Sequence, residues 1–157
     1  MFYLLSFQNH KSYSFIVLGT GHPLKPGPLV MLVHGGPNAR DNWGYVRTSQ
    51  LLANRGYAVM QCNYRGSTGY GKNFTYIANG EWGRKMHYDV IDAANWAVEQ
   101  GIAEQNRIAI YGGSYGGYAA LAGESRHYSV KKGENQILPP VHVFCFSNHR
   151  IHKKPQF

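Results

Sequence analysis

The sequence Gly112-Gly113-Ser114-Tyr115-Gly116 places a serine between two glycines at the spacing Gly-x-Ser-x-Gly. This spacing is typical of a nucleophile elbow, a tight strand-to-helix turn that exposes the serine hydroxyl to a substrate carbonyl. The motif is meaningful only between a buried strand and a helix. An apolar run at 108–111 precedes it and an Ala/Leu-rich run at 118–122 follows it. Ser114 is therefore predicted to be the nucleophile of an acyl-transfer reaction.

Two backbone amides are predicted to bind the oxyanion that forms when a serine attacks a carbonyl. The first is the Tyr115 N–H, at the N-terminus of the helix that follows Ser114. The second comes from His34-Gly35-Gly36-Pro37, which directly follows an apolar run, and Gly36 is our choice of donor. In α/β-hydrolases a His-Gly-Gly loop supplies this amide, and the catalytic base follows the nucleophile in the chain. His34 is therefore expected to shape the loop rather than to act as the base.

A second glycine-rich segment, 66–72, fits the Gly-x-x-x-x-Gly-Lys part of a phosphate-binding loop. Asn73 stands where such a loop needs a Ser or Thr to bind Mg²⁺, and the sequence shows no clear helix opening there. We therefore reject a phosphate-binding function, and we expect neither a cofactor nor a metal.

The elements that must hold these residues alternate between strands and helices. Apolar runs rich in strand formers predict three buried strands, at 29–33, 57–62 and 108–111. Helices are predicted at 45–55, with Leu51 and Leu52 facing the core, from Asp89 to Gly101, and after Ser114. Residues 63–86 predict a long, polar loop, and a loop of that length in a compact domain is usually functional or disordered. This alternation indicates an α/β fold, with a mainly parallel sheet and helical crossovers.

The chain is predicted to have three regions: residues 1–27 without a clear fold, a core at 28–123, and a basic tail at 124–157. The tail holds six Lys or Arg against two Glu, a net of +4, which is half of the net charge of +8. Residues 141–146 are a further candidate strand. Unless the tail covers it, the strand before the elbow would be an unprotected edge, so a marginal fold is predicted.

Composition excludes several classes of protein. With 43% hydrophobic and 15% charged residues, the chain is globular rather than disordered. No apolar run approaches the roughly 18 residues of a membrane span, and the basic residues follow no nucleic-acid-binding motif. Neither a membrane nor a nucleic acid is therefore an expected partner. Cys62 falls in a predicted buried strand and has only Cys145 to pair with, which favours a reduced, cytoplasmic location.

Five motifs, in order, resemble the catalytic domain of the prolyl oligopeptidase family of serine peptidases, especially its acylaminoacyl-peptidase-like branch. They are the loop at 34–37, Gln50-Leu51-Leu52-Ala53 with Arg55-Gly56-Tyr57, the segment Asn63 to Gly71, Gly80-Glu81-Trp82-Gly83, and the elbow at 112–118. The match runs from about Pro28 to Gly123. This resemblance implies part of an α/β-hydrolase domain, with Ser114 as nucleophile and peptides or acylated peptides as substrates.

The resemblance also implies roles for residues around Ser114. Tyr70 matches a tyrosine whose hydroxyl contributes to the oxyanion hole in some relatives, whereas in others a backbone amide like that of Gly36 does so. Both alternatives stay open. Arg65, Glu81 and Trp82 match positions that hold the flanking loop in place, and a structural role is predicted for them.

The remaining members of a catalytic triad are not evident in the sequence. A histidine must take the serine proton and a carboxylate must orient it, in the chain order Ser, Asp/Glu, His. No Asp follows Ser114, and the candidates that remain are Glu124, Glu134, His142, His149 and His152, none in a segment that resembles the family. Two hypotheses follow. The chain is a serine peptidase, or it is a truncated, non-catalytic fragment or isoform that lacks the triad Asp and His.

Overall fold

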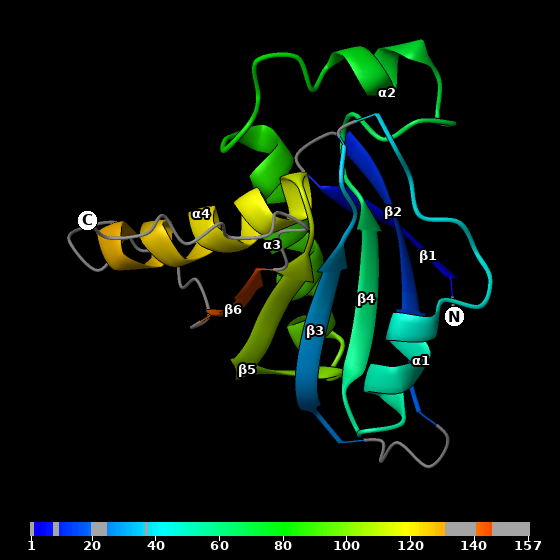
Figure 1. Cartoon of the computed structure of the whole chain (residues 1–157), viewed down its shortest axis with the longest axis vertical. Helices are drawn as coiled ribbons and strands as arrows, with labels where there is room; N and C mark the ends of the chain where they lie inside the picture. Colours follow the sequence, from blue (N-terminus) through cyan, green and yellow to red (C-terminus); the bar gives the residue numbers. More distant parts are fainter. Residues whose placement is uncertain (1, 8–9, 20–24, 37, 131–140, 146–157) are drawn as a thin grey trace, which may run out of the picture.

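The computed structural model describes residues 2–7, 10–19, 25–36, 38–130 and 141–145, with side chains described at 13–19, 25–36 and 38–122. These residues form one six-stranded sheet in the order β1-β2-β4-β3-β5-β6 (Figure 1). The strands are β1 (Phe2–Phe7), β2 (His10–Val17), β3 (Gly27–Val33), β4 (Ala58–Asn63), β5 (Ala103–Gly112) and β6 (Val141–Cys145). The helices are α1 (Arg47–Ala53), α2 (Lys72–Tyr76), α3 (Lys85–Glu99) and α4 (Tyr115–Val130).

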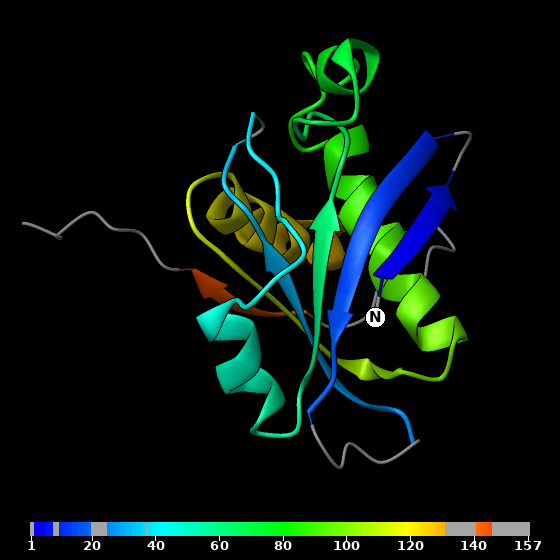
Figure 2. The ribbon, with the colours of Figure 1, turned by 90° about the vertical axis from the view of Figure 1, so that its right-hand side faces the viewer.

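The sheet is mixed, with a parallel half and an antiparallel half. β3 is parallel to β4 and β5, and β5 is parallel to β6, whereas β2 is antiparallel to both β1 and β4. Helices α1 and α3 lie on opposite faces of the sheet (Figures 1 and 2). The predicted α/β fold with helical crossovers is therefore confirmed.

The central strands are buried on both faces, as their unbroken apolar runs predict. All six residues of β4 are buried, and five of the seven residues of β3. The register pairs Val33, the last residue of β3, with Gly112, the last residue of β5. Because parallel strands end at the same edge of a sheet, the loop after β3 and the elbow after β5 begin side by side.

The structure differs from the sequence prediction at residues 1–27. Instead of a segment without a clear fold, β1 and β2 form an antiparallel pair, and β2 continues the sheet by pairing with β4 from Tyr13↔Asn63 to Val17↔Val59. Ser14, Phe15 and Ile16 are all buried. Polar and aromatic residues alternate from Ser12 to Phe15, but the alternation is short and stops at Ile16. The strand forms because β4 offers it an edge.

The structure differs from the sequence predictions at three helices. On α1, Leu51 is 51% exposed and the inward residues are Ser49 and Ala53, so the prediction that Leu51 faces the core was wrong. A short helix, α2, opens at Lys72, inside the segment that was predicted to be a loop. α4 runs on to Val130, beyond the helical pattern recognisable in the sequence.

The candidate strand in the tail is confirmed. β6 pairs with β5 from Ile108↔Val141 to Gly112↔Cys145, and it contacts α4. The strand that leads into the elbow is therefore covered on both sides, by β3 and by β6. The edge of β5 that the sequence predicts to be unprotected is therefore paired with β6.

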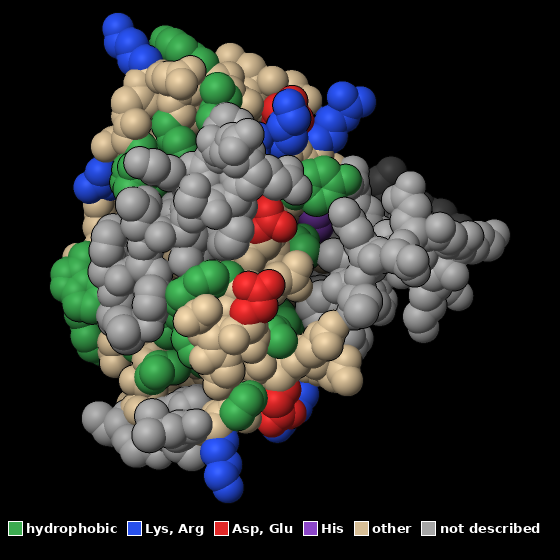
Figure 3. Space-filling model, turned by 180° about the vertical axis from the view of Figure 1, so that it is seen from behind, with side chains coloured by type: hydrophobic (Ala, Val, Ile, Leu, Met, Phe, Trp, Pro, Cys, Tyr) green, Lys and Arg blue, Asp and Glu red, His purple; other side chains and the backbone are tan. Residues whose placement is uncertain are grey.

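Seen from behind, the described Lys and Arg side chains stand apart from one another around the rim of the molecule (Figure 3). Acidic side chains lie near the middle of this face and also beside basic side chains at its top and bottom. Within the described part of the chain, no helix is both long enough and apolar enough to span a bilayer.

A buried ion pair ties the segment after β4 to α3. The Arg65 guanidinium donates from Nε to Asp89 Oδ2 at 2.8 Å and from Nη2 to Asp89 Oδ1 at 2.6 Å, and the Arg65 backbone N–H also donates to Oδ2 at 2.9 Å. The side chains are only 3% and 5% exposed. Such a bidentate geometry pairs the two charges where water is excluded.

Replacing Arg65 is expected to destabilise the fold strongly. Arg65→Met leaves the Asp89 carboxylate buried without its counter-ion, which should cost about 3–5 kcal/mol of unfolding free energy. Arg107→Met is the matched control, because the Arg107–Glu104 pair is 55% and 41% exposed and should contribute at most about 1 kcal/mol. Urea unfolding followed by tryptophan fluorescence measures both. Equal losses in the two variants would contradict the importance of the buried pair.

Candidate active site

Ser114 stands on the turn between β5 and α4 in a strained backbone conformation. Its φ is 55°, the only positive φ of a non-glycine residue in the described part of the chain. A left-handed conformation costs an L-residue about 1–2 kcal/mol. Ser114 is exposed, as a nucleophile must be. Strand, strained serine and helix together are the geometry of a nucleophile elbow, as the motif predicts.

The two flanking glycines of the motif are required by packing. A Cβ built on Gly112 or on Gly116 would overlap the carbonyl oxygen of Val33. The end of β3 therefore approaches the elbow so closely that neither position has room for a side chain. This close approach brings the chain that leaves β3 alongside Ser114.

The loop after β3 lies directly against the nucleophile. A Cβ on Gly35 would be 3.3 Å from Ser114 Cβ and 3.8 Å from Ser114 Oγ. Gly36, our choice of oxyanion donor, has φ 149°, and a Cβ there would lie 3.0 Å from the Asn38 nitrogen. The structure thus brings the predicted loop to Ser114 and places Gly35 in contact with it. Whether the Gly36 amide is the donor stays a prediction.

The other predicted amide donor lies at the start of α4. The first turn is closed by bonds from Gly116 N–H to the Gly113 oxygen and from Tyr118 N–H to the Ser114 oxygen, each at 3.0 Å. Neither bond uses the Tyr115 N–H, which is one of the first four amides that a helix leaves without an internal partner. The positive end of the helix dipole would favour an oxyanion at this amide.

Tyr70 is held by β2 and β4. Its ring stacks on Tyr13 with centroids 3.8 Å apart, and Asn63 Nδ2 donates to its hydroxyl oxygen at 2.9 Å. Burial raises the pKa of Tyr70 above its usual value, so the hydroxyl stays protonated at neutral pH. Its proton remains available because Asn63 is the donor in their bond. A role for this hydroxyl in the oxyanion hole stays a prediction.

Aromatic rings pack around the Tyr115 side chain next to the elbow. Tyr64 and Trp82 lie 4.8 Å and 5.0 Å away between ring centroids, and Tyr118 lies 5.7 Å from Trp82. Trp82 thus packs the 80–83 segment on α4, which is the kind of structural role predicted for it. Glu81 forms an exposed pair with Lys85 at 3.4 Å. Burial raises the pKa of the Tyr115 and Tyr64 hydroxyls above their usual values, so both remain neutral.

Sequence reasoning singled out neither Tyr64 nor Asp89 as part of the site. Tyr64 lies inside one of the motifs that resemble the family, and Asp89 marks only the start of a predicted helix. The signal that could have found the Arg65–Asp89 ion pair was an Arg in a motif-rich segment directly after a predicted buried strand, because an Arg that is buried there requires an acidic partner.

The candidate acid and base of the triad, Glu124, Glu134, His142, His149 and His152, have side chains outside the part of the chain that the structure describes. Within the described residues, no three His, Cys, Asp or Glu side chains gather as metal ligands would.

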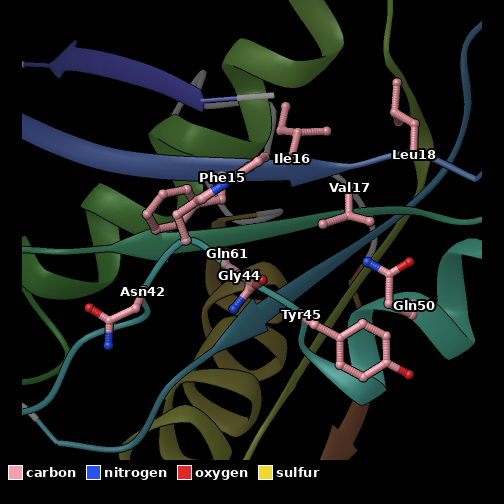
Figure 4. A pocket seen from close by; sticks show the side chains of 10 residues that line it. Phe15, Ile16, Val17, Leu18, Asn42, Gly44, Tyr45, Gln50 and Gln61 are labelled. Atoms are coloured by element: carbon pink, nitrogen blue, oxygen red, sulfur yellow. The ribbon is translucent and has the colours of Figure 1, made fainter.

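A cavity of about 500 Å³ opens between β2, α1 and the loop at 42–45 (Figure 4). Phe15 and Tyr45 line it together with the amide side chains of Gln50 and Gln61, and none of its lining residues is charged. Ser114 is not among the lining residues, so this cavity and the elbow are separate features.

A strained, exposed serine between a buried strand and a helix, beside a glycine loop from the neighbouring strand, is the geometry of the elbow in an α/β-hydrolase domain. A model of the prolyl oligopeptidase family matches residues 43–129, more than half of the chain. The chain belongs to the prolyl oligopeptidase family. The match continues past Gly123, where the recognisable motifs end.

Comparisons with individual proteins give the same result. Dipeptidyl aminopeptidase BIII of Pseudoxanthomonas mexicana is 64% identical over 98 residues, 62% of this chain and 14% of the relative. The acylamino-acid-releasing enzyme of Rattus norvegicus is 38% identical over 118 residues, 71% of this chain and 16% of the relative. The solved structure of a Mycobacterium tuberculosis puromycin-hydrolyzing peptidase has a TM-score of 0.69 at 31% identity, covering 78% of this chain and 20% of that chain. The chain thus spans less than a quarter of each of these proteins.

Replacing Gly116 tests the close approach at the elbow. Alanine usually stabilises a helix relative to glycine by about 1 kcal/mol, but here its Cβ overlaps the Val33 carbonyl oxygen. Gly116→Ala should therefore destabilise the fold by about 3 kcal/mol. Gly80→Ala is the control: its φ is 74° and nothing lies within 4 Å of an added Cβ, so only the backbone cost of about 1–2 kcal/mol applies. The urea concentrations at the midpoints of unfolding compare the two variants. A Gly116→Ala variant more stable than the wild type would show that the Val33 carbonyl does not lie this close to Gly116.

Proposed function

We propose that this protein is a serine peptidase in which Ser114 is the nucleophile. The observation that carries the proposal is the strained, exposed Ser114 with Gly35 packed against it. In this reaction the Ser114 hydroxyl oxygen would attack the peptide carbonyl, and its proton would pass to a histidine base. The Tyr115 N–H and an amide of the 34–36 loop would stabilise the oxyanion.

The substrates proposed are peptides from which a short N-terminal unit is released. Two kinds of relative support this proposal, a dipeptidyl aminopeptidase at 64% identity and an acylamino-acid-releasing enzyme at 38% identity. The higher identity favours release of a dipeptide from a free N-terminus over release of an acylated residue.

A fluorophosphonate probe tests the nucleophile, because it reacts with a serine only when a base activates the hydroxyl. Wild-type protein should form one covalent adduct on Ser114, identified by peptide mass spectrometry, and Ser114→Ala should form none. Ser49→Ala is the matched control, because Ser49 is buried on α1, bonds to Gln61 and should not alter labelling. A wild-type chain that stays unlabelled would contradict peptidase activity in this chain and favour the non-catalytic hypothesis.

A pair of chromogenic substrates tests the proposed specificity. We expect kcat/KM for an unblocked dipeptidyl-4-nitroanilide to exceed that for an N-acetyl-alanyl-4-nitroanilide by at least about tenfold, a difference of about 1.4 kcal/mol in transition-state binding. Ser114→Ala provides the background rate for both. The reverse preference would assign the chain to the acyl-releasing class of activity.

A further inference from the structure

His34, Tyr64 and Ser67 form a hydrogen-bonded cluster behind the 34–36 loop. The Tyr64 hydroxyl donates to the His34 carbonyl oxygen at 3.0 Å, and His34 Nδ1 lies 2.6 Å from the Gly35 carbonyl oxygen. A carbonyl oxygen only accepts hydrogen bonds, so Nδ1 carries the proton and donates it to Gly35. On the other side of the ring, Nε2 lies 3.1 Å from Ser67 Oγ. Every polar atom of the imidazole is therefore engaged.

These bonds hold two consecutive peptide groups. The His34 carbonyl belongs to the same planar peptide as the Gly35 N–H, and the Gly35 carbonyl to the same peptide as the Gly36 N–H. In a trans peptide the C=O and the N–H point in opposite directions. Fixing each carbonyl therefore fixes the direction of the amide behind it. The N–H groups of Gly35 and of Gly36, the predicted donor, are both oriented in this way.

The Tyr64 side chain is itself fixed in place by burial and by ring packing. It is 0% exposed, and its ring lies between the His34 ring at 4.6 Å and the Tyr115 ring at 4.8 Å. The next residue, Arg65, is fixed through its backbone and guanidinium to Asp89. A Cβ on Gly36 would lie 3.4 Å from the Tyr64 hydroxyl oxygen. The cluster thus attaches the loop beside Ser114 to β4 and α3 and restricts its motion.

We propose that Tyr64 is a positioning residue that, together with the His34 side chain, presets the Gly35 and Gly36 amides before a substrate arrives. Its catalytic meaning rests on the proposed peptidase function. Donors that are already oriented need no reorganisation when the oxyanion forms, and this preorganisation is a large source of rate enhancement in acyl transfer. Glycines alone would leave the loop free, because they permit almost any backbone conformation.

Two variants each remove the hydrogen bond that holds one of the two backbone peptide groups. Tyr64→Phe keeps the stacked ring but removes the donor to the His34 carbonyl, and His34→Phe keeps an aromatic ring but removes the donor to the Gly35 carbonyl. NMR relaxation of the backbone ¹⁵N–¹H groups should show the order parameter of Gly35 falling in the first variant and that of Gly36 in the second, from about 0.85 to below about 0.6. In Tyr64→Phe the His34 carbonyl ¹³C resonance should also shift, because this carbonyl loses the hydrogen bond from the Tyr64 hydroxyl.

Tyr57→Phe is the matched control, because Tyr57 is 37% exposed and lies outside the cluster; its order parameters should equal those of the wild type. Unchanged order parameters at Gly35 in Tyr64→Phe and at Gly36 in His34→Phe would overturn the proposal. If one variant fails to fold, the other still decides the outcome for its own peptide.

The rate of Ser114 labelling by a fluorophosphonate separates this proposal from the proposed function. We expect Tyr64→Phe to slow the labelling step about tenfold, the effect of about one hydrogen bond, with the half-saturating probe concentration unchanged. A wild-type chain that is not labelled would refute the peptidase activity, whereas the order parameters would still decide the positioning role. Labelling at the wild-type rate in Tyr64→Phe would overturn the role of Tyr64.

Discussion

The approach of the β3 backbone to the nucleophile turn sets the geometry of the whole site. The Val33 carbonyl oxygen occupies the space that side chains at Gly112 and Gly116 would need. Because the two strands end in register, with Val33 opposite Gly112, the loop that leaves β3 has to pass directly over Ser114. One steric constraint therefore explains the glycines of the motif and the presence of Gly35 beside Ser114.

A second layer of interactions makes this arrangement rigid. The Arg65–Asp89 pair ties the end of β4 to α3 where both side chains are almost fully excluded from solvent. From this fixed point, the Tyr64 ring reaches between His34 and Tyr115. The Asn63 amide donates to both the Asp41 carbonyl and the Tyr70 hydroxyl. Side chains of three consecutive residues, 63–65, thus tie the end of β4 to the segment after β3, to the start of α4 and to α3.

The chain builds the elbow and the glycine loop on neighbouring strands of the parallel part of the sheet. Ser114 and the amides near it depend on strand ends that are adjacent in space, and β3, β4 and β5 supply these ends. A base and its orienting carboxylate come later in the chain in this fold. The oxyanion donors need no base to be in place, because they are set by backbone geometry. Binding of an oxyanion and activation of Ser114 are therefore separable properties.

The sequence by itself determined the elbow, the glycine loop, the three central strands and the α/β class, because each is written in local patterns: unbroken apolar runs, glycines at fixed spacing, and helical periodicity. It did not determine β2, where the alternation of polar and aromatic residues is short and stops at Ile16, or the exposure of Leu51. Those depend on which strand edge or sheet face a segment meets. The hydrogen bond from the Tyr64 hydroxyl to the His34 carbonyl oxygen joins residues 30 positions apart. Only the tertiary structure decides such contacts, because hydrogen bonds between distant residues leave no periodic trace in the chain.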